Sequence, residues 1–213
     1  MMKPEKMIAS LLMDIEAVKL SPENPFTWAS GWKSPIYCDN RKTLSYPHVR
    51  NTIGEEFARK IKEQYPQVEV IAGVATGAIA HGLLVAQALD LPFIYVRSSA
   101  KKHGLGNQVE GAWKKGQKVV VIEDLVSTGG SSLAAVEALK GEELEVLGMM
   151  AIFTYGFTVA DENFAKANVK LTTLSDYHAL LDLALDANYI TADQKKVLSD
   201  WRKSPSTWNP TTL

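Results

Sequence analysis

The sequence predicts an α/β fold in which a central, mainly parallel sheet is covered by helices on both faces. Two runs rich in β-branched apolar residues, 68–74 and 119–122, are typical of buried strands. Other segments have helical spacing, and one of them has apolar residues four positions apart, at Val49, Ile53, Phe57 and Ile61. Because such strands and helices alternate along the chain, a parallel sheet is favoured.

The N-terminal part is predicted to form one helix followed by irregular structure. Apolar residues at helical spacing predict a helix near 5–19. Residues 26–46 mix aromatic side chains with Ser, Gly, Pro and basic residues, so short irregular strands fit this segment better than a helix. An amphipathic helix is then expected after Pro47.

Strands and helices alternate through the rest of the chain. Strands are predicted at 68–74, 93–97, 119–122, 146–153 and 169–174. Helices are predicted at 79–89, at 132–140 and near 161–167, and two more follow toward the C-terminus. The tail 204–213, rich in Pro, Ser and Thr, is expected to fray. Trp201 and Trp208 are expected to pack rather than to stack on a base.

Length and composition indicate one globular domain that spans residues 1–213. Apolar residues make up 46% of the chain and charged residues 22%, which is ordinary for a soluble protein. The formal net charge of −1 gives no global field that would attract nucleic acid or a membrane. The single cysteine, Cys38, excludes an intrachain disulfide and is compatible with a reducing compartment. We therefore expect a cytoplasmic protein without a nucleic-acid or membrane partner.

Residues 119–132 are the most informative segment. A buried strand leads to two acids, Glu123 and Asp124, and then to the small-residue loop 127–131 before a helix. In an open α/β sheet, ligands bind beyond the carboxyl ends of the strands. Backbone N–H groups and hydroxyls at a helix N-terminus can hold a phosphate, whereas carboxylates accept hydrogen bonds from sugar hydroxyls. Alone, each feature is more often a turn or a solvated acidic pair; together they predict a site for ribose 5-phosphate.

A basic segment, 97–111, follows the strand at 93–97. It carries Arg97, Lys101, Lys102 and His103, and glycines that can act as hinges. Charged loops are usually just solvated, but structureless loops of this length are uncommon in compact domains and often bind ligands. Because this one begins at the same sheet edge as Glu123 and Asp124, we expect it to close over an anionic ligand.

The joint pattern of 119–132 resembles the signature for phosphoribosyl pyrophosphate (PRPP) in type I phosphoribosyltransferases. Nearly the whole chain is similar to the orotate-specific branch of that family, on the segments 26–37, 39–41, 97–104 and 119–132. The resemblance implies the type I phosphoribosyltransferase fold, with a small N-terminal hood. It divides the single domain into a hood of about 1–46 plus C-terminal elements and a PRPP-binding core of about 47–175.

The resemblance also implies an activity. Members of this branch transfer ribose 5-phosphate from PRPP to N1 of orotate, which gives orotidine 5′-monophosphate and pyrophosphate in de novo pyrimidine (UMP) biosynthesis. They depend on Mg²⁺, which PRPP and water hold with no direct protein ligand. Loop residues from the neighbouring subunit reach the pyrophosphate, so the resemblance implies a homodimer with shared active sites.

Site residues follow from the resemblance by position. Lys101, His103 and Asp124 are the expected catalytic residues: the cations neutralise or protonate the leaving pyrophosphate, and the acid favours positive charge on the ribose. The family's pyrophosphate loop, often with a strained peptide bond, corresponds to Ala75, Thr76 and Gly77. The expected PRPP-binding residues are Arg97, Lys101, His103, Glu123, Asp124, Leu125, Val126, Ser127, Thr128, Gly129, Gly130 and Ser131.

The orotate site departs from the family's pattern. Ser127 is expected to contact orotate, but Ala29 replaces a lysine of the hood and Ser98 replaces a common basic residue. In addition, no arginine follows the strand at 146–153. The orotate carboxylate therefore lacks its usual partner, and Lys33 and Arg41 are our hypothesis for replacements.

Three other functions compete with orotate transfer. A PRPP-sensing regulator that binds nucleic acid is disfavoured by the net charge of −1 and by the absence of an added module. A transferase for another base, such as a purine, would be accompanied by a different hood. A non-catalytic interaction domain would not explain an acidic pair together with a cationic loop. A zinc site is not expected, because His48, His81 and His178 lack ligand-spaced partners.

Overall fold

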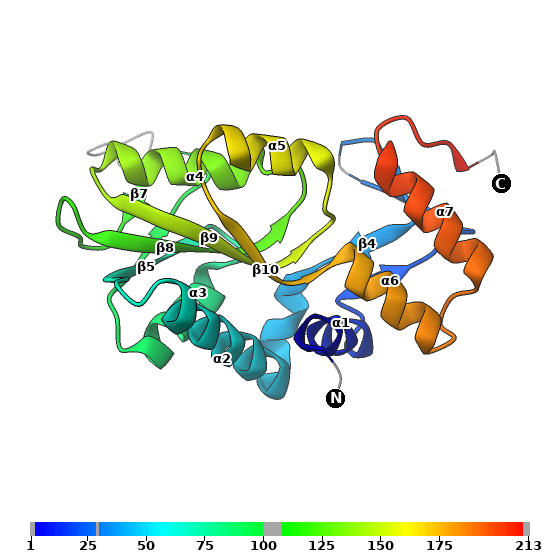
Figure 1. The fold of residues 1–213 in the computed structure, drawn as a ribbon, viewed down its shortest axis with the longest axis horizontal. Coiled ribbons are helices and arrows are strands. Elements are labelled where there is room, and N and C mark those ends of the chain that lie inside the picture. The colour runs from blue at the N-terminus through cyan, green and yellow to red at the C-terminus, as the bar shows by residue number, and fades with distance from the viewer. Residues whose placement is uncertain (1–2, 29, 100–107, 211–213) are drawn as a thin grey trace.

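A six-stranded sheet forms the centre of the molecule (Figure 1). The computed structural model describes residues 3–28, 30–99 and 108–210. The strand order is β10 (Leu171–Asp176), β9 (Glu145–Thr154), β8 (Lys118–Val126), β5 (Val70–Val74), β6 (Phe93–Val96) and β7 (Val109–Glu110). All neighbours are parallel except β7, which pairs antiparallel with β6. The predicted mainly parallel sheet is confirmed.

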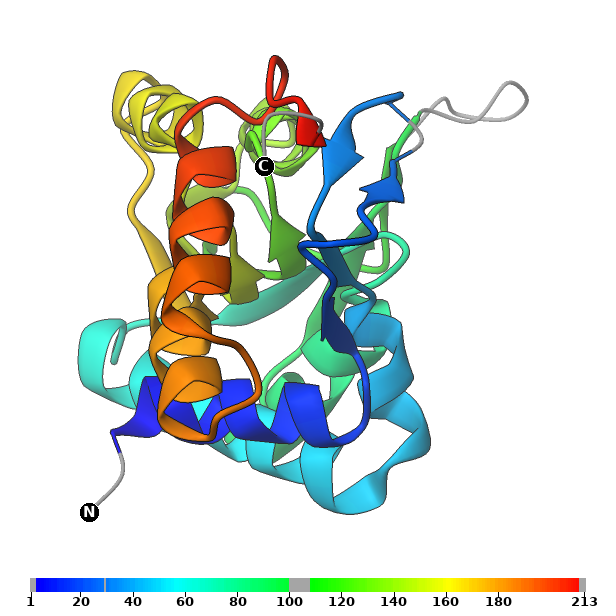
Figure 2. The same ribbon diagram turned by 90° about the vertical axis from the view of Figure 1, so that its right-hand side faces the viewer.

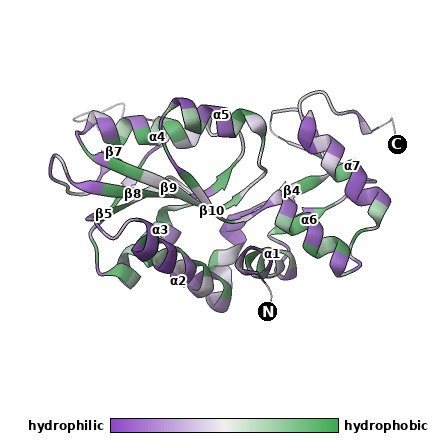
Figure 3. Ribbon diagram, in the orientation of Figure 1, coloured by the Kyte–Doolittle hydropathy of each residue, from purple (hydrophilic) through white to green (hydrophobic). Residues whose placement is uncertain are grey.

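Helices cover both faces of the sheet, as predicted. In Figure 1, α4 (Gly130–Gly141) and α5 (Thr158–Lys166) lie above it. On the other side lie α2 (Pro47–Gln64), α3 (Ile79–Leu89) and α1 (Pro4–Asp14). Each face has its own apolar core, and alternate residues of β8 supply them: Val119 and Val121 to the α4 side, Val120 and Ile122 to the other. Figure 3 shows this central sheet as predominantly hydrophobic.

A smaller unit lies beside the carboxyl end of the sheet, and we call it the hood. It contains β1 (Val18–Leu20) paired with β4 (Ile36–Cys38), and β2 (Phe26–Thr27) paired with β3 (Lys33–Ser34). The 3₁₀ helix η1 (Asn40–Ser45) then leads to α2. Figure 2 shows these strands across a gap from α6 (Tyr177–Asp186) and α7 (Ala192–Lys203). The short irregular strands predicted for this segment are confirmed.

Helix α7 fastens the C-terminal part of the chain to the hood. Trp201 is fully buried, and its Nε1 donates to the carbonyl of Lys33 at 3.1 Å. Its ring lies edge-on to that of Trp28, with centroids 5.6 Å apart. The predicted packing role of Trp201 is confirmed, and Trp208 also packs against the main core.

The prediction of a helix over 5–19 is wrong only in its last five residues, 15–19. Helix α1 ends at Asp14, Glu16 has a left-handed φ of 54°, and the chain enters β1. Ile15 and Val18 are buried, but Val18 is buried from a strand. Apolar spacing over so short a stretch is compatible with a helix and with a strand. The strand forms because β1 pairs with β4.

The predicted end of the strand at 119–122 is also wrong, with consequences for the site. Strand β8 continues to Val126, so Glu123 and Asp124 lie within it. Pairing with β9 persists to Val126, whereas pairing with β5 stops at Ile122. The strand order reverses at β5 and β8, and such a switch point is where α/β sheets bind ligands.

The described part of the tail is more ordered than predicted. The N–H groups of Thr207 and Trp208 donate to the carbonyl of Ser204, and residues 211–213 lie outside the described part. Within the ranges that the structure describes, no helix is both long and apolar enough to cross a bilayer.

Candidate active site

The two acids of β8 point to opposite faces of the sheet, as neighbouring strand residues must. Glu123 faces α4: its Oε2 accepts from the Ser132 hydroxyl at 2.9 Å, and its Oε1 accepts from the backbone N–H of Asp124 at 3.0 Å. The residue is only 5% exposed. Burial, reinforced by the nearby Asp124 carboxylate, raises the pKa of Glu123. The predicted contact of Glu123 with a ribose hydroxyl stays a prediction.

Asp124 faces a polar cavity of about 340 Å³ on the other side of β8. This polar cavity is lined by Cys38, Asp39, Asn40, Arg41, Thr76, Gly77, Asp124 and Leu125. Gly77 lies so close that a Cβ there would overlap the Asp124 carboxylate. Burial raises the pKa of Asp124, although backbone N–H groups oppose the shift. The structure therefore joins Asp124 with the predicted pyrophosphate loop, whose Ala75–Thr76 peptide bond is cis.

The loop 127–131 turns from β8 into the N-terminus of α4. Gly129 has a left-handed φ of 83°, and a Cβ there would lie 2.8 Å from the ring of Phe164. The carbonyl of Thr128 is held by Asn163 Nδ2 at 3.0 Å. Helix α5 therefore supports the loop from behind, while the first N–H groups of α4 remain available for an anion.

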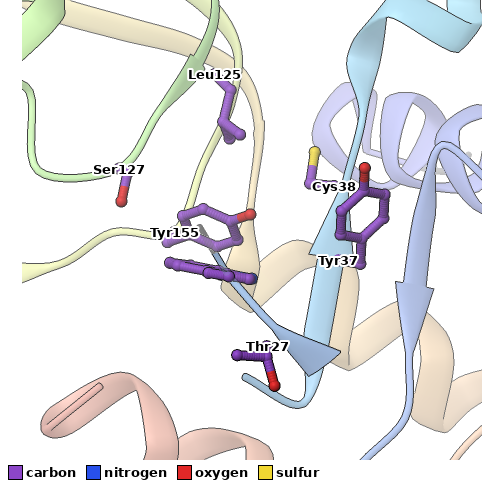
Figure 4. A pocket seen from close by; sticks show the side chains of 7 residues that line it. Thr27, Tyr37, Cys38, Leu125, Ser127 and Tyr155 are labelled. Carbon is purple, nitrogen blue, oxygen red and sulfur yellow. The ribbon is translucent and has the colours of Figure 1, made fainter. Parts of the chain in front are cut away.

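A second cavity, mostly apolar and of about 300 Å³, adjoins the polar cavity. Its lining residues are Thr27, Trp28, Tyr37, Cys38, Leu125, Ser127 and Tyr155. Figure 4 shows these side chains facing one another across the cavity. Because Cys38 and Leu125 line both cavities, the two form adjacent compartments. A flat aromatic ring bound against Trp28 and Tyr155 would lie beside the polar cavity.

Aromatic rings pack against one another along the wall of this apolar cavity. The ring centroid of Tyr155 lies 5.1 Å from that of Trp28 and 5.4 Å from that of Phe157. Burial raises the pKa of Tyr155 well above its ordinary value and also raises the pKa of the Cys38 thiol. Both groups therefore stay protonated at neutral pH, and a protonated thiol is a poor nucleophile.

Of the predicted cationic loop, the structure describes only the two ends. The backbone N–H of Arg97 donates to the carbonyl of Gln108 at 2.9 Å, and Gln108 Nε2 returns a bond to the carbonyl of Arg97 at 2.8 Å. Arg97 Nη1 is 3.3 Å from Glu110 Oε1. Lys101 and His103 lie outside the described residues. The paired ends nevertheless place the segment at the carboxyl end of β6.

Comparisons with known proteins decide the family. The model of the phosphoribosyl transferase domain matches residues 48–187. An orotate phosphoribosyltransferase of Porphyromonas gingivalis is 62% identical over 203 residues, which cover 95% of this chain and 97% of that protein. The chain belongs to the orotate phosphoribosyltransferase family.

Solved structures with a similar fold include members of this family. An orotate phosphoribosyltransferase from Aeropyrum pernix has a TM-score of 0.75 at 26% identity, over 87% of this chain and 100% of that chain. A Leishmania donovani UMP synthase has a TM-score of 0.78 at 28% identity. The match covers 93% of this chain and 42% of that chain. The predicted type I phosphoribosyltransferase fold is confirmed.

The two hypothetical partners of the orotate carboxylate lie in different places. Lys33 Nζ donates to the hydroxyl of Thr27 at 2.7 Å, and Thr27 lines the apolar cavity. Arg41 lines the polar cavity instead, where its guanidinium binds both oxygens of Asp39. In this member of the orotate phosphoribosyltransferase family, Lys33 therefore lies beside the apolar cavity and Arg41 lines the polar one, and their roles toward orotate stay a prediction.

An arginine does reach the end of β9, although none follows it in sequence. Arg202 of α7 donates from Nη1 to the carbonyl of Gly156 at 2.5 Å. Sequence reasoning also missed the cavity-lining roles of Trp28, Tyr155 and Asn40. Tyr155 directly follows β9, so its place at a strand's carboxyl end was the available signal. The placement of Trp28 and Asn40 depends on how the hood packs, which no local pattern reveals.

Proposed function

We propose that this protein transfers ribose 5-phosphate from PRPP to N1 of orotate, which gives orotidine 5′-monophosphate and pyrophosphate. One observation carries the proposal: the phosphate loop 127–131, the polar cavity with Asp124 and the apolar cavity with Trp28 meet around Leu125. A sugar phosphate in the first two compartments directs its C1 toward a planar base in the third. De novo UMP synthesis is the pathway that this reaction serves.

The chain's own residues bind and orient the two substrates. N–H groups and hydroxyls of 127–131 hold the 5′-phosphate, and Asp124 accepts from a ribose hydroxyl. As the bond from C1 to pyrophosphate breaks, positive charge develops on the ribose and the Asp124 carboxylate favours it. Lys101 and His103 neutralise or protonate the leaving pyrophosphate. Orotate N1 attacks C1 as the pyrophosphate leaves, and the N1 proton passes to water or to the released pyrophosphate. Most of the rate therefore comes from alignment.

Magnesium fits this site as an ion that arrives with PRPP. Among the described residues, no cluster of three His, Cys, Asp or Glu side chains can hold a metal. Mg²⁺ commonly binds through one or two carboxylates, water and substrate phosphates, and Asp124 faces the polar cavity where such an ion would lie. When bound, the ion neutralises charge on the leaving pyrophosphate.

We further propose a cytoplasmic homodimer in which Arg97, Lys101 and His103 serve the active site of the other subunit. The described ends of this loop support the proposal, because Arg97 and Gln108 pair with each other at the carboxyl end of β6. The single cysteine and the absence of a spanning helix in the described chain are consistent with the cytoplasm.

The test follows orotate by its ultraviolet absorbance, with PRPP and Mg²⁺ present. We expect turnover by the wild type, strong loss after EDTA, and at least a hundredfold slower turnover by Lys101→Ala, about what loss of a transition-state charge partner costs. Lys115→Ala, an exposed lysine paired with Glu143, is the control and should leave the rate unchanged. Binding of PRPP without turnover of orotate would instead favour another base or a PRPP sensor.

A further inference from the structure

A buried polar network joins η1 to the main chain at Asp124. Asn40, the first residue of η1, is 1% exposed. Its Nδ2 donates to the carbonyl of Asp124 at 2.6 Å, across 84 positions of sequence, and its Oδ1 accepts from Cys38 Sγ at 3.4 Å. Both ends of this amide are therefore committed to protein partners.

The bond to Asp124 lies where β8 loses a neighbouring strand. On the β5 side the last pair is Gly73 with Ile122, whereas on the β9 side pairing continues through Leu125 and Val126. Beyond Ile122, the main chain of β8 thus lacks a partner strand toward β5. The amide of Asn40 supplies one hydrogen bond that a strand would otherwise give. It does so at the residue whose carboxylate faces the polar cavity.

Two further buried residues hold Asn40 in turn. Thr43 Oγ1 donates to the carbonyl of Asn40 at 2.6 Å, and His81 Nε2 lies 2.8 Å from the same hydroxyl oxygen. Because the Thr43 proton is used toward Asn40, the histidine is the donor in the second bond. Both Thr43 and His81 are fully buried. His81 belongs to α3, which follows the 75–77 loop, so the network connects η1, β8 and α3.

We propose that Asn40 is a positioning residue, which holds the main chain at Asp124 so that the carboxylate faces the polar cavity, with Thr43 and His81 fixing Asn40. The inference rests on the proposed function, in which Asp124 binds the ribose. A shift of the carboxylate by about 1 Å can cost about a hundredfold in rate. Because the Asp124 carboxylate contacts the ribose and also favours the positive charge that develops there, its displacement should slow the chemical step more than it weakens PRPP binding.

The test compares Asn40→Asp with Thr43→Val. Asn40→Asp keeps the shape of the side chain but replaces the donor toward the Asp124 carbonyl by an acceptor. We expect the single-turnover rate and kcat to fall about 10- to 100-fold, with a smaller rise in the KM of PRPP and little change in the KM of orotate. Single turnover is needed because product release can limit kcat. Thr43→Val removes the hydroxyl without touching either cavity and should give a smaller fall of the same kind.

Thr52→Val is the matched control, since its hydroxyl donates only to His48 within the exposed part of α2. It should keep the wild-type rate. If Asn40→Asp does not fold, Thr43→Val still decides. An unchanged single-turnover rate in the folded variants would overturn the inference. A raised KM for PRPP at constant kcat would also overturn it, because Asn40 would then bind the substrate. Absence of wild-type turnover would refute the proposed function instead.

Discussion

At the scale of single residues, the two acids of β8 have different electrostatic environments although they are adjacent in sequence. Burial raises the pKa of both, but Glu123 is buried against Ser132 whereas Asp124 opens to the polar cavity. The motif alone predicts two equivalent ribose ligands. Their different environments depend on the length of β8 and on what covers each face, so they could not be inferred from the motif.

The raised pKa of Glu123 predicts a stability change with pH. Above the ordinary value of 4.5 the unfolded chain releases this proton while the folded chain keeps it, so stability falls as pH rises toward the folded pKa. Glu123→Gln mimics the protonated acid: its oxygen can accept from the Asp124 N–H and its amide can donate to Ser132. We expect the variant to melt a few degrees higher than wild type at pH 8, at about 2–4 °C per kcal/mol.

His81 also makes the stability depend on pH, and it sets the pH above which the effect of Glu123 can be measured alone. Burial lowers its pKa from 6.5 to about 4, so the unfolded chain binds a proton more readily and stability falls as pH drops below 6.5. The effects of Glu123 and His81 oppose each other below 6.5, and only that of Glu123 remains above it. Thermal melts of both proteins at pH 5 and pH 8 test the argument. If the melting temperature of Glu123→Gln exceeded that of the wild type by no more at pH 8 than at pH 5, the prediction would be wrong.

Lys33 carries a prediction about recognition of the base. Lys33→Met should raise the KM of orotate about tenfold or more, since a hydrogen bond to a charged group contributes about 1.5–3 kcal/mol. The KM of PRPP should stay the same. Arg41→Met, placed in the polar cavity, should affect PRPP more than orotate. Steady-state kinetics with each substrate varied separate the two residues, and an unchanged orotate KM in both variants would remove both hypotheses.

At the scale of elements, the sequence predicts the regular parts of the sheet well and their ends poorly. Helix α3 is found at the predicted residues, because its apolar pattern is bounded by the 75–78 loop and by Asp90. The end of α1 and the extension of β8 were missed. Both depend on pairing with distant strands, β4 for the first and β9 for the second. Local periodicity carries no information about such partners.

The phosphate loop requires glycine at one position for two independent reasons. Gly129→Ala forces an unfavourable φ and presses a methyl group against Phe164. We expect a loss of about 1–3 kcal/mol in the free energy of unfolding, together with a raised KM for PRPP. Chemical denaturation and steady-state kinetics measure the two effects.

Gly141→Ala is the control, because Gly141 lies in the last turn of α4, the helix that Gly129 precedes. A Cβ there meets no atom within 4 Å, so the change should stabilise the protein by about 0.5–1 kcal/mol. If Gly129→Ala were as stable as this control and bound PRPP as wild type does, the loop would not depend on the glycine.

At the scale of the whole molecule, the site is assembled from segments distant in sequence. The hood contributes Trp28 and Cys38, strand β9 leads to Tyr155, and α7 anchors the hood through Trp201. The aromatic character of 26–46 marked the hood as unusual, but only the folded chain shows that its rings form one wall with Tyr155. Family resemblance predicted the signature residues, because they form one continuous segment.

Sharing of active sites between subunits gives the last prediction. Lys101→Ala removes a loop cation and Asp124→Asn removes the ribose acid, so each homodimer should be nearly inactive. If the loop serves the opposite subunit, a hybrid of the two variants has one doubly defective site and one intact site. Co-expression with two different tags and tandem purification should then give a hybrid with about half the wild-type rate, as expected from two-fold symmetry.

A loop that serves its own subunit leads to the opposite result. Each site of the hybrid would then carry one defect, and the hybrid would be as inactive as its parents. Failure to isolate any hybrid would exclude a stable dimer. Because both variants retain the hood, the sheet and the phosphate loop, recovered activity could arise only from pairing one chain's loop with the other chain's Asp124. The assay therefore places the complete catalytic unit in the dimer or in the single chain.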